Sequence, residues 1–362
     1  MKVVVGISGG VDSSVAALLL KKQGHEIIGL FMRNWDSTLN QDILGNPNLN
    51  NLICPQEKDY NDALQVCEKL NIPLHRVDFT KEYWDYVFSY FLDELKANRT
   101  PNPDVMCNRY IKFDLFINEA KKLGAEAIAT GHYARFENNQ LLKAIDKNKD
   151  QSYFLAQVPL KQFQNILFPL GNLNKKEVRD IAKENNLFVA NKKDSTGICF
   201  IGERNFSQFL ENYLPLKPGK IVKLETNKVI GDHRGLAYYT IGQRRGLKVG
   251  GTKNRLFVVS KDLEKNILYV TEKEENLYSD EATIIKMNWL AKIPKKCMAK
   301  FRYRQKDNPV EIISIKKDEI RIKYNNVKAV TPGQICVLYD GELCLGSGII
   351  NQVFYQGKTK NV

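Results

Sequence analysis

The first 135 residues alternate between short apolar strands and amphipathic helices, and this alternation constrains the fold more than any other feature. The first strand is a β-branched run, as is typical of a parallel strand that is covered on both faces. We predict strands over Val3–Ile7, Ile27–Met32, Leu74–Phe79 and Ala127–Thr130, with helices at 13–23, 57–70, 81–97 and 110–123. Strand–helix alternation indicates an α/β fold, here a doubly wound parallel sheet with helices on both faces.

The character of the sequence changes after Pro215, where short strands and glycine turns replace the helices. The last helices are expected at 174–185 and 205–213. Strands are predicted over Ile221–Leu224, Leu236–Ile241, Leu256–Ser260, Ile267–Thr271, Val310–Ile315 and Ile320–Tyr324. Regularly spaced short strands indicate small β-rich domains. We therefore predict three domains: a catalytic α/β domain (1–214), a small central β-rich domain (215–281) and a C-terminal β-barrel (282–362).

Composition favours a polyanionic partner. Lys and Arg number 54 against 41 Asp and Glu, which gives a formal net charge of +13. Such an excess attracts nucleic acid, although a lysine-rich surface without a partner would give the same count. We see no apolar run long enough to span a bilayer and no signal or transit peptide. A cytoplasmic protein without a membrane partner is expected.

The cysteines do not form a disulfide or zinc pattern. There are seven, an odd number, and none is arranged as CxxC. This argues against a disulfide scaffold or a four-cysteine zinc site. Five of them are expected to pack in the interior: Cys54, Cys67, Cys297, Cys336 and Cys344.

The strongest local motif is Ser8-Gly9-Gly10-Val11-Asp12-Ser13, which follows the first strand and begins a helix. Two glycines permit a tight turn and bring backbone N–H groups close to a phosphate. Asp12 either caps the helix or holds Mg²⁺ beside the phosphates. The spacing differs from that of a GxxxxGKS/T loop. The motif resembles the SGGxDS signature of the N-type ATP pyrophosphatase (PP-loop) superfamily, which implies adenylation of a substrate and release of pyrophosphate.

Further ATP contacts are expected at the carboxyl ends of neighbouring strands, where open α/β sheets bind ligands. Met32 ends the second predicted strand and offers its backbone and thioether to adenine, although a core methionine is the common alternative. Gly131 ends the fourth and lets a ribose or adenine approach. The predicted ATP-binding residues are Gly6, Ile7, Ser8, Gly9, Gly10, Val11, Asp12, Ser13, Met32 and Gly131.

Two cysteines lie in polar surroundings. Cys107, in Asn102–Arg109, is expected near a helix N-terminus, which together with Arg109 lowers a thiol pKa, while Asp104 opposes this effect. Cys199, in Asp194–Gly202, is framed by glycines and follows the basic pair Lys192-Lys193. For each cysteine taken alone, a buried structural role is the alternative.

Together, the glycine loop, NPDxxCN and DSTGICFIG resemble the tRNA-specific 2-thiouridylases of bacteria and mitochondria. The similarity continues through Gly242–Leu247, Phe301–Gln305 and Pro332–Gln334, and so spans essentially the whole chain. It implies an enzyme that uses ATP and Mg²⁺ to adenylate the C2 oxygen of the wobble uridine. Cys199 would then carry persulfide sulfur from an upstream donor protein, with Cys107 as nucleophile. The products would be 2-thiouridine, AMP and an oxidised cysteine pair.

The same resemblance implies contacts with the anticodon arm of tRNA. Asp104 would lie beside the base, as a proton acceptor or as an orienting group. Basic residues with an interleaved tyrosine suit phosphate contact and stacking. The residues implied are Asn102, Pro103, Asp104, His132, Lys149, Asp150, Gln151, Arg302, Tyr303, Arg304 and Gln334, with Arg244 and Arg245 as further phosphate contacts. A structural histidine at 132 and a solvated basic strand at 302–304 are the alternatives.

Two other functions fit parts of the sequence. A PP-loop ligase or amidating enzyme acting on a small molecule, similar to the NAD or argininosuccinate synthetases, would need neither the cysteine pair nor a basic β-domain. A non-catalytic RNA-binding protein would bind tRNA but release no pyrophosphate.

Overall fold

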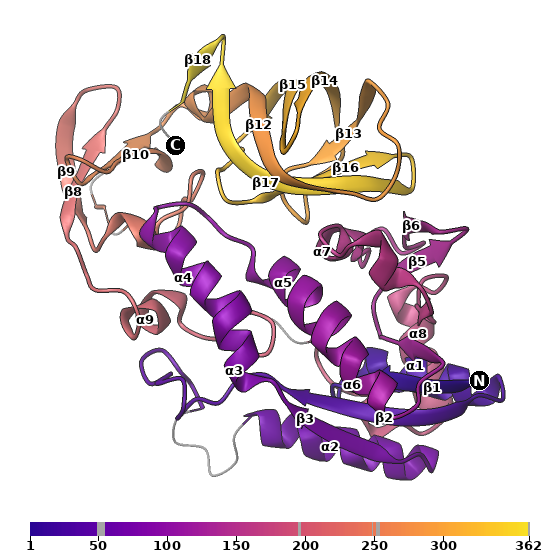
Figure 1. Ribbon diagram of the computed structural model, residues 1–362. Helices are drawn as coiled ribbons and strands as arrows, with labels where there is room; N and C mark the ends of the chain where they lie inside the picture. The colour runs from indigo at the N-terminus through magenta and orange to yellow at the C-terminus, as the bar shows by residue number, and fades with distance from the viewer. Residues whose placement is uncertain (49–54, 195–196, 248, 251–253, 361–362) are drawn as a thin grey trace. The chain divides into compact units, whose positions relative to one another are not determined.

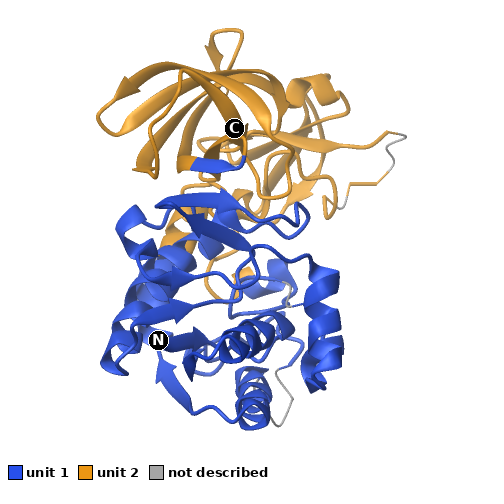
Figure 2. Ribbon diagram, turned by 90° about the vertical axis from the view of Figure 1, so that its right-hand side faces the viewer, with its two compact units in different colours: residues 1–89, 103–209, 342–344 blue, residues 90–102, 210–341, 345–362 orange. Residues whose placement is uncertain are grey.

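The computed structural model describes residues 1–48, 55–194, 197–247, 249–250 and 254–360 (Figure 1). Contacts within the chain divide it into two compact units (Figure 2). Unit 1 comprises residues 1–89, 103–209 and 342–344, and unit 2 comprises residues 90–102, 210–341 and 345–362. The division into three domains stays a prediction.

Unit 1 contains a parallel sheet in the strand order β3-β2-β1-β4-β7. Its strands are β1 (Lys2–Gly6), β2 (Glu26–Arg33), β3 (Leu74–Asp78), β4 (Ala127–Ala129) and β7 (Ile166–Leu167). The first four were predicted, and β7 was missed because it has only two residues. Chain order reverses beside β1, so the carboxyl ends of β1 and β4 flank a topological switch point, where such sheets bind ligands.

Helices cover both faces of this sheet, which confirms the doubly wound prediction. Helices α1 (Val11–Lys22), α2 (Pro55–Leu70) and α8 (Lys175–Glu184) share one hydrophobic core with the side chains of Val3 and Val5. On the other face, α6 (Phe116–Lys122) places Phe116 against Gly6, where an added Cβ would lie 3.3 Å from the ring. Figure 1 shows α2 and α6 on opposite sides of the sheet.

Two predicted helices contain π-helical turns. The first runs through α3 (Thr80–Tyr83), η1 (Trp84–Phe88) and α4 (Ser89–Lys96), and the second through α5 (Pro103–Met106), η2 (Cys107–Leu115) and α6. The second begins seven residues before the predicted start at 110, so Cys107 lies one turn inside it. It ends before Gly124, whose φ of +79° suits the predicted helix stop.

The rest of unit 1 consists of short elements. Strands β5 (Ala134–Glu137) and β6 (Gln140–Lys143) form an antiparallel hairpin. The remaining helical segments are α7 (Ser152–Leu155), η3 (Leu160–Phe163), η4 (Phe188–Asn191) and α9 (Phe206–Glu211), which continues into unit 2.

Unit 2 contains a closed antiparallel barrel, as predicted for the C-terminal region. Among the described residues, six strands run in the order β12-β15-β14-β13-β16-β17, and pairing of β12 with β17 closes the ring. These strands are β12 (Tyr278–Trp289), β13 (Lys296–Lys300), β14 (Asn308–Lys316), β15 (Glu319–Lys328), β16 (Ile335–Asp340) and β17 (Leu343–Tyr355), and the short β18 (Lys358–Thr359) pairs with β17.

A separate sheet of unit 2 has the order β10-β11-β8-β9. Its strands are β8 (Gly219–Lys223), β9 (Lys228–His233), β10 (Phe257–Asp262) and β11 (Ile267–Thr271); η6 (Glu274–Leu277) follows. The strand predicted over 236–241 is wrong, because this segment forms the single turn η5 (Leu236–Tyr238). Gly235, at φ +150°, redirects the chain, and the Tyr238 hydroxyl donates to the carbonyl of Leu214. Both Leu236 and Tyr239 are buried, so no strand-like alternation exists.

Candidate active site

The glycine loop connects β1 to α1 at the switch point of the sheet. Gly9 has a φ of +71°, and a Cβ there would lie 2.2 Å from the carbonyl oxygen of Asp59, so only glycine fits. Gly10 is the N-cap of α1, and no side chain caps this helix. Ser13 accepts a hydrogen bond from the Ser8 N–H at 3.1 Å and thereby closes the loop. The N–H groups of the first turn are therefore available to an anion.

Asp12 does not cap the helix, which excludes one of the two roles predicted for it. It lies in the first turn, after the true cap, Gly10. Its carboxylate accepts two hydrogen bonds from the Lys175 ammonium, at 2.7 and 2.8 Å, and one from the Tyr133 hydroxyl at 2.8 Å. The carboxylate is thus held at the switch point, where it can also meet a cation.

Lys175 connects the glycine loop to the segment that carries Cys199. Its ammonium lies 2.7 Å from a carboxylate oxygen of Asp194 as well. Asp194 also pairs with Lys149 at 2.5 Å and with Arg179 at 3.0 Å. Burial opposes ionisation, but the hydrogen bonds from Lys149 and Lys175 lower the pKa of Asp194 to about 2. Ser195 and Thr196, the next residues of the predicted motif, lie outside the described residues.

The loop after β4 meets the glycine loop. A Cβ on Gly131 would lie 2.8 Å from the backbone nitrogen of Ser13, so the two loops are in close contact. His132 is buried and shares a hydrogen bond of 2.8 Å between Nδ1 and the Thr130 hydroxyl. Burial, with the charge of Lys112, lowers the pKa of His132, so the ring is neutral. Met32 is half-buried and lies one residue before the end of β2, rather than at its end.

The structure brings the two predicted cysteines together. Their Sγ atoms lie 3.8 Å apart although the residues are 92 positions apart in the sequence. A disulfide bond is about 2.05 Å long, so a small movement would join them. Cys107, in η2, has no exposed surface, whereas Cys199 is half-buried.

The loop that carries Cys199 is a tight turn with three residues at positive φ: Gly197 at +95°, Phe200 at +67° and Gly202 at +80°. A bridge between Ile198 and Gly202 closes it. The Cys199 N–H donates to the Asp104 carboxylate at 2.9 Å.

Buried polar groups hold the other side of the same turn. The Tyr83 hydroxyl donates to the Cys199 carbonyl at 2.8 Å. The Gln56 amide donates to the Phe200 carbonyl at 2.8 Å. The peptide groups on both sides of the thiol are thus fixed, and its sulfur is directed at Cys107.

The predicted ionisation of Cys107 is wrong. Burial raises the pKa of the Cys107 thiol, because this residue lies a turn inside the helix and has no access to water. Arg109, expected to assist ionisation, instead donates to Gln157 at 2.7 Å. The hydrogen bond from Cys107 and the charge of Lys112 lower the pKa of Cys199, so Cys199 is the more acidic thiol. Burial also raises the pKa of Asp104.

Three residues of this region were not found from the sequence: Tyr83, Lys112 and Lys175. Lys112 follows Cys107 by five residues. This spacing places two side chains on the same side of a π-helix, but not of an α-helix. Lys175 begins α8, and the Asn174–Glu177 capping box marks that helix start in the sequence. Lys192, expected beside Cys199, instead pairs with Asp59 and Asp62.

The candidate tRNA contacts of unit 1 are held within the protein. Lys149 pairs with Asp194 at 2.5 Å, and the Gln151 amide oxygen accepts from the Tyr133 N–H at 3.0 Å. Asp150 is buried and accepts from the N–H groups of Ala144 and Ser152. Pro103 is half-buried. Lys149 and Gln151 thus contact Asp194 and Tyr133, two residues that are linked to Asp12 of the glycine loop, Asp194 through Lys175 and Tyr133 directly.

In unit 2, the candidate contacts differ in exposure. The Arg302 guanidinium donates to the carbonyls of Ile241 and Ala329, and the Gln334 amide donates to the carbonyls of Thr100 and Pro101. Exposed side chains are those of Arg244, Arg245 and Arg304, while Asn102 and Tyr303 are half-buried.

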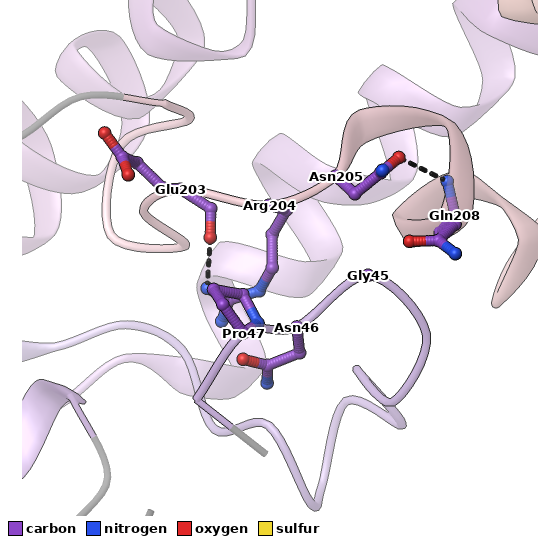
Figure 3. Close-up of a pocket in the computed structure, with 7 residues that line it drawn as sticks. All are labelled: Gly45, Asn46, Pro47, Glu203, Arg204, Asn205 and Gln208. Atoms are coloured by element: carbon purple, nitrogen blue, oxygen red, sulfur yellow. Dashed lines mark hydrogen bonds between the residues drawn. The ribbon is translucent and has the colours of Figure 1, made fainter.

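A cavity of about 460 Å³ lies elsewhere in unit 1, between residues 45–47 and 203–208 (Figure 3). Arg204 reaches into it but is already bound to the buried carboxylate of Asp42 at 2.8 Å. The polar segment 34–48 is anchored in part, because Trp35 and Asp42 are buried. Residues 49–51 lie outside the described part of the chain. No thiol lines this cavity among the described residues, and it is not the reactive site.

The remaining features to describe are the other cysteines, possible membrane-spanning helices and possible metal sites. Cys67, Cys297, Cys336 and Cys344 are buried, as expected for packing residues, and Cys54 lies outside the described residues. Within the described residues, no helix is both long and apolar enough to cross a membrane. The same residues contain no group of three His, Cys, Asp or Glu side chains placed to hold a metal ion.

Comparison with known proteins gives matches along nearly the whole chain. Three family profiles match in succession: a tRNA methyl transferase HUP domain over residues 1–203, a tRNA methyl transferase PRC-barrel domain over 207–272, and an aminomethyltransferase beta-barrel domain over 279–350. The chain is 56% identical to the tRNA-specific 2-thiouridylase MnmA of Metamycoplasma arthritidis, over 99% of this chain and 98% of that protein. It is 55% identical to that of Mycoplasma capricolum, over 97% of this chain and 99% of that protein.

Among solved structures, a 4-thiouridine synthetase–RNA complex with bound ATP aligns with 58% of this chain and 50% of that chain. The identity is 18% and the TM-score is 0.35, so the structural similarity is weak.

Proposed function

The chain belongs to the tRNA-specific 2-thiouridylase family, and from this premise we propose that it transfers sulfur to C2 of the wobble uridine in tRNA. The observation that carries the proposal is the pair of thiols, Cys107 and Cys199, 3.8 Å apart in the unit that also contains the uncapped glycine loop. A small-molecule ligase of the same superfamily would have no use for this pair.

The glycine loop suits the phosphates of ATP. The first turn of α1 offers N–H groups without a side-chain cap, and Lys175 and Lys192 place positive charge beside the loop. Asp12 provides one carboxylate, which fits Mg²⁺ because this ion is commonly bound by one or two carboxylates together with phosphate oxygens and water. Bound Mg²⁺ would neutralise charge on the phosphates. Asp12 would hold the ion, and the first turn of α1 would stabilise the leaving pyrophosphate.

Sulfur transfer then follows from the chemistry of the two thiols. The Cys199 thiolate attacks the terminal sulfur of a donor persulfide; the donor S–S bond breaks, the donor leaves as a thiolate, and a Cys199 persulfide forms. The terminal sulfur of this persulfide attacks C2 of the adenylated uracil.

Cys107 supplies the second step. Burial raises the pKa of the Cys107 thiol, so this thiol gives up its proton as it attacks, and we assign the Asp104 carboxylate as the acceptor. The Cys107 sulfur bonds to the Cys199 sulfur, the bond between Cys199 and the transferred sulfur breaks, and the electron pair stays with the sulfur on the uracil. AMP leaves with the former C2 oxygen, and a Cys107–Cys199 disulfide remains. The exposure of the two residues supports this order, since Cys199 is half-buried and Cys107 has no exposed surface. An external thiol reductant must reduce the disulfide before the next turnover.

Asp104 has two proposed roles in these steps. It orients Cys199 through the backbone N–H, at 2.9 Å. Because burial raises the pKa of its carboxyl group, it also suits proton transfer near the base.

The partners remain proposals as well. We assign the anticodon arm of tRNA to the exposed arginines Arg244, Arg245 and Arg304, with Tyr303 beside them. A single-stranded anticodon base can be extruded into a pocket at a low cost in free energy, because no base pair has to be broken. We place the reaction in the cytoplasm, with an upstream persulfide-carrying protein as sulfur donor.

The proposal is tested with purified protein, tRNA, ATP, Mg²⁺ and a persulfide donor, by measuring pyrophosphate and sulfur in the RNA. The wild type should release pyrophosphate and form 2-thiouridine. Cys107→Ser and Cys199→Ser should each lower sulfur incorporation by at least about a hundredfold, and the packing control Cys297→Ser should not. Pyrophosphate release without sulfur in the RNA, unaffected by the cysteine substitutions, would indicate a ligase instead. Binding of tRNA without pyrophosphate release would indicate a non-catalytic RNA-binding protein.

A further inference from the structure

A half-buried cation, Lys112, lies beside the turn that carries Cys199. The Lys112 Nζ lies 5.5 Å from the centroid of the ring of Phe200, the residue after Cys199, and the charge of Lys112 lowers the pKa of the Cys199 thiol. Lys112 thus faces the turn that carries the reactive thiol. Its ammonium takes no part in the salt bridges found among the described residues.

The π-helical segment η2 is the reason that Lys112 reaches this position. Hydrogen bonds in a π-helix join residues five apart, so residue 112 follows residue 107 by one turn on the same side. In an α-helix, a residue five positions on would point away by more than a quarter turn. The wider turn thus brings the Cys107 thiol to the Cys199 sulfur and the Lys112 ammonium to the neighbouring Phe200 ring. Single π-helical turns often occur at functional sites.

The charges around Lys112 are few. The titratable groups that face it are Asp104 on α5, Cys107 on η2, Cys199 on its turn and His132 after β4. His132 is neutral because burial lowers its pKa, and burial also keeps Tyr83, the remaining neighbour of the sulfurs, protonated. Lys112 stays protonated because its attraction to Cys199, Cys107 and Asp104 outweighs the effect of burial on its pKa.

We propose that Lys112 stabilises the anionic form of the Cys199 sulfur from its place on η2, beside the turn that carries this cysteine. This inference rests on the proposed function, in which Cys199 reacts as a thiolate and then as a persulfide. In the first step, the anion attacks the donor persulfide and needs no separate base. In the persulfide, the same ammonium stabilises the terminal sulfur as an anion for attack on C2. Arg109 and Lys192, the nearby cations in sequence, are bound to other groups.

Alkylation by iodoacetamide tests this role in the full-length, reduced protein without tRNA or ATP. Only the thiolate reacts: a bond forms from the Cys199 sulfur to carbon, and iodide leaves. The rate at Cys199 is measured by peptide mass spectrometry as a function of pH. Lys112→Gln should raise the pKa of the Cys199 thiol. Each pKa unit of this rise should slow the alkylation of Cys199 at neutral pH about tenfold. Lys112→Arg, which keeps the charge, should stay within about threefold of the wild type.

Two controls separate Lys112 from other effects. Lys122→Gln removes an exposed charge from α6, where Lys122 pairs with Glu119, and should leave the alkylation profile unchanged. Cys107→Ala removes the thiol that hydrogen-bonds to Cys199, and Lys112→Gln should slow alkylation in this background too. An unchanged Cys199 profile in Lys112→Gln, with or without Cys107, would overturn the proposal.

The outcome does not depend on the proposed function, because neither adenylation nor sulfur transfer takes part in alkylation. If Lys112→Gln does not fold, the Cys107→Ala profile decides instead, because this variant lacks the other group that lowers the Cys199 pKa. A midpoint for Cys199 below the ordinary thiol value of about 8.5 supports the proposal, and a midpoint at or above it contradicts the proposal.

Discussion

At the scale of single residues, the position of the Cys199 sulfur depends on hydrogen bonds to its backbone rather than on contacts of the thiol itself. Asp104 accepts from its N–H, and Tyr83 donates to its carbonyl. Tyr83 is fully buried, so the hydroxyl has no competing water. These two residues therefore fix where the sulfur lies.

Tyr83→Phe should destabilise the protein and slow the reaction between the thiols. Loss of the hydroxyl leaves the Cys199 carbonyl without its donor, at a cost of about 1–3 kcal/mol in urea unfolding. Diamide should then form the Cys107–Cys199 disulfide more slowly, because the turn is less well held. Tyr86→Phe, at a side chain that is 52% exposed, is the matched control. Equal oxidation rates in wild type and Tyr83→Phe would refute this role.

Asp194 should make stability depend on acid pH. Its pKa is lowered from 3.8 to about 2 in the folded protein, so the folded state binds fewer protons than the unfolded chain in this range. The stabilising contribution is fully present above pH 3.8 and is lost as pH falls through about 2. Asp194→Asn should flatten the pH profile of the unfolding free energy there, compared with Asp93→Asn at an exposed site. Parallel profiles for the wild type and Asp194→Asn would contradict the assignment.

At the scale of elements, the turn 197–202 determines whether Cys199 can face Cys107. Gly197 and Gly202 both have positive φ, but their surroundings differ. A Cβ on Gly197 would lie 2.2 Å from the Gly202 carbonyl oxygen, whereas a Cβ on Gly202 would meet nothing within 4 Å. Substitution by alanine therefore tests backbone strain alone at Gly202, and backbone strain together with a steric clash at Gly197.

Gly202→Ala should cost about 1–2 kcal/mol, the usual cost of a side chain in the left-handed region. Gly197→Ala should cost more and should slow diamide-induced disulfide formation strongly, since the bridge between Ile198 and Gly202 cannot close. Both quantities are measurable on the purified variants. If Gly197→Ala oxidises as fast as Gly202→Ala, the turn does not position the thiol.

The elements also show what the sequence could predict. The strands of the parallel sheet and the loop Ser8–Ser13 follow from local apolar runs and from glycine at one strand end, so they were predictable. The turn at 236–241 was not, because its run of apolar residues resembles a strand, while Gly235, at positive φ, redirects the chain. The π-helical form of η2 leaves no signature in the sequence. Lys112 and the burial of Cys107 were therefore missed.

At the scale of the whole molecule, the net charge of +13 predicts salt-sensitive binding of tRNA. Substitutions of two neighbouring arginines of unit 2 should distinguish an effect on tRNA binding from an effect on stability. Arg304 is exposed, whereas the Arg302 guanidinium donates to two backbone carbonyls.

Arg304→Ala should weaken tRNA binding and lower the slope of log affinity against log salt by about 1, without a change in unfolding. Arg302→Ala should instead destabilise the protein by about 2 kcal/mol or more, because charged hydrogen bonds to buried carbonyls are lost. Filter binding across a salt series and urea unfolding measure the two effects. Tight tRNA binding that is unaffected by salt would contradict a phosphate-contacting surface.

The central claim is that one turnover couples sulfur transfer to oxidation of two neighbouring thiols. The most direct test is a single turnover without reductant, with Cys199 loaded as a persulfide and tRNA and ATP added. Nucleoside mass spectrometry counts 2-thiouridine, and peptide mass spectrometry counts the Cys107–Cys199 disulfide. The account predicts one disulfide for each 2-thiouridine formed. Formation of 2-thiouridine with both thiols still reduced would contradict it.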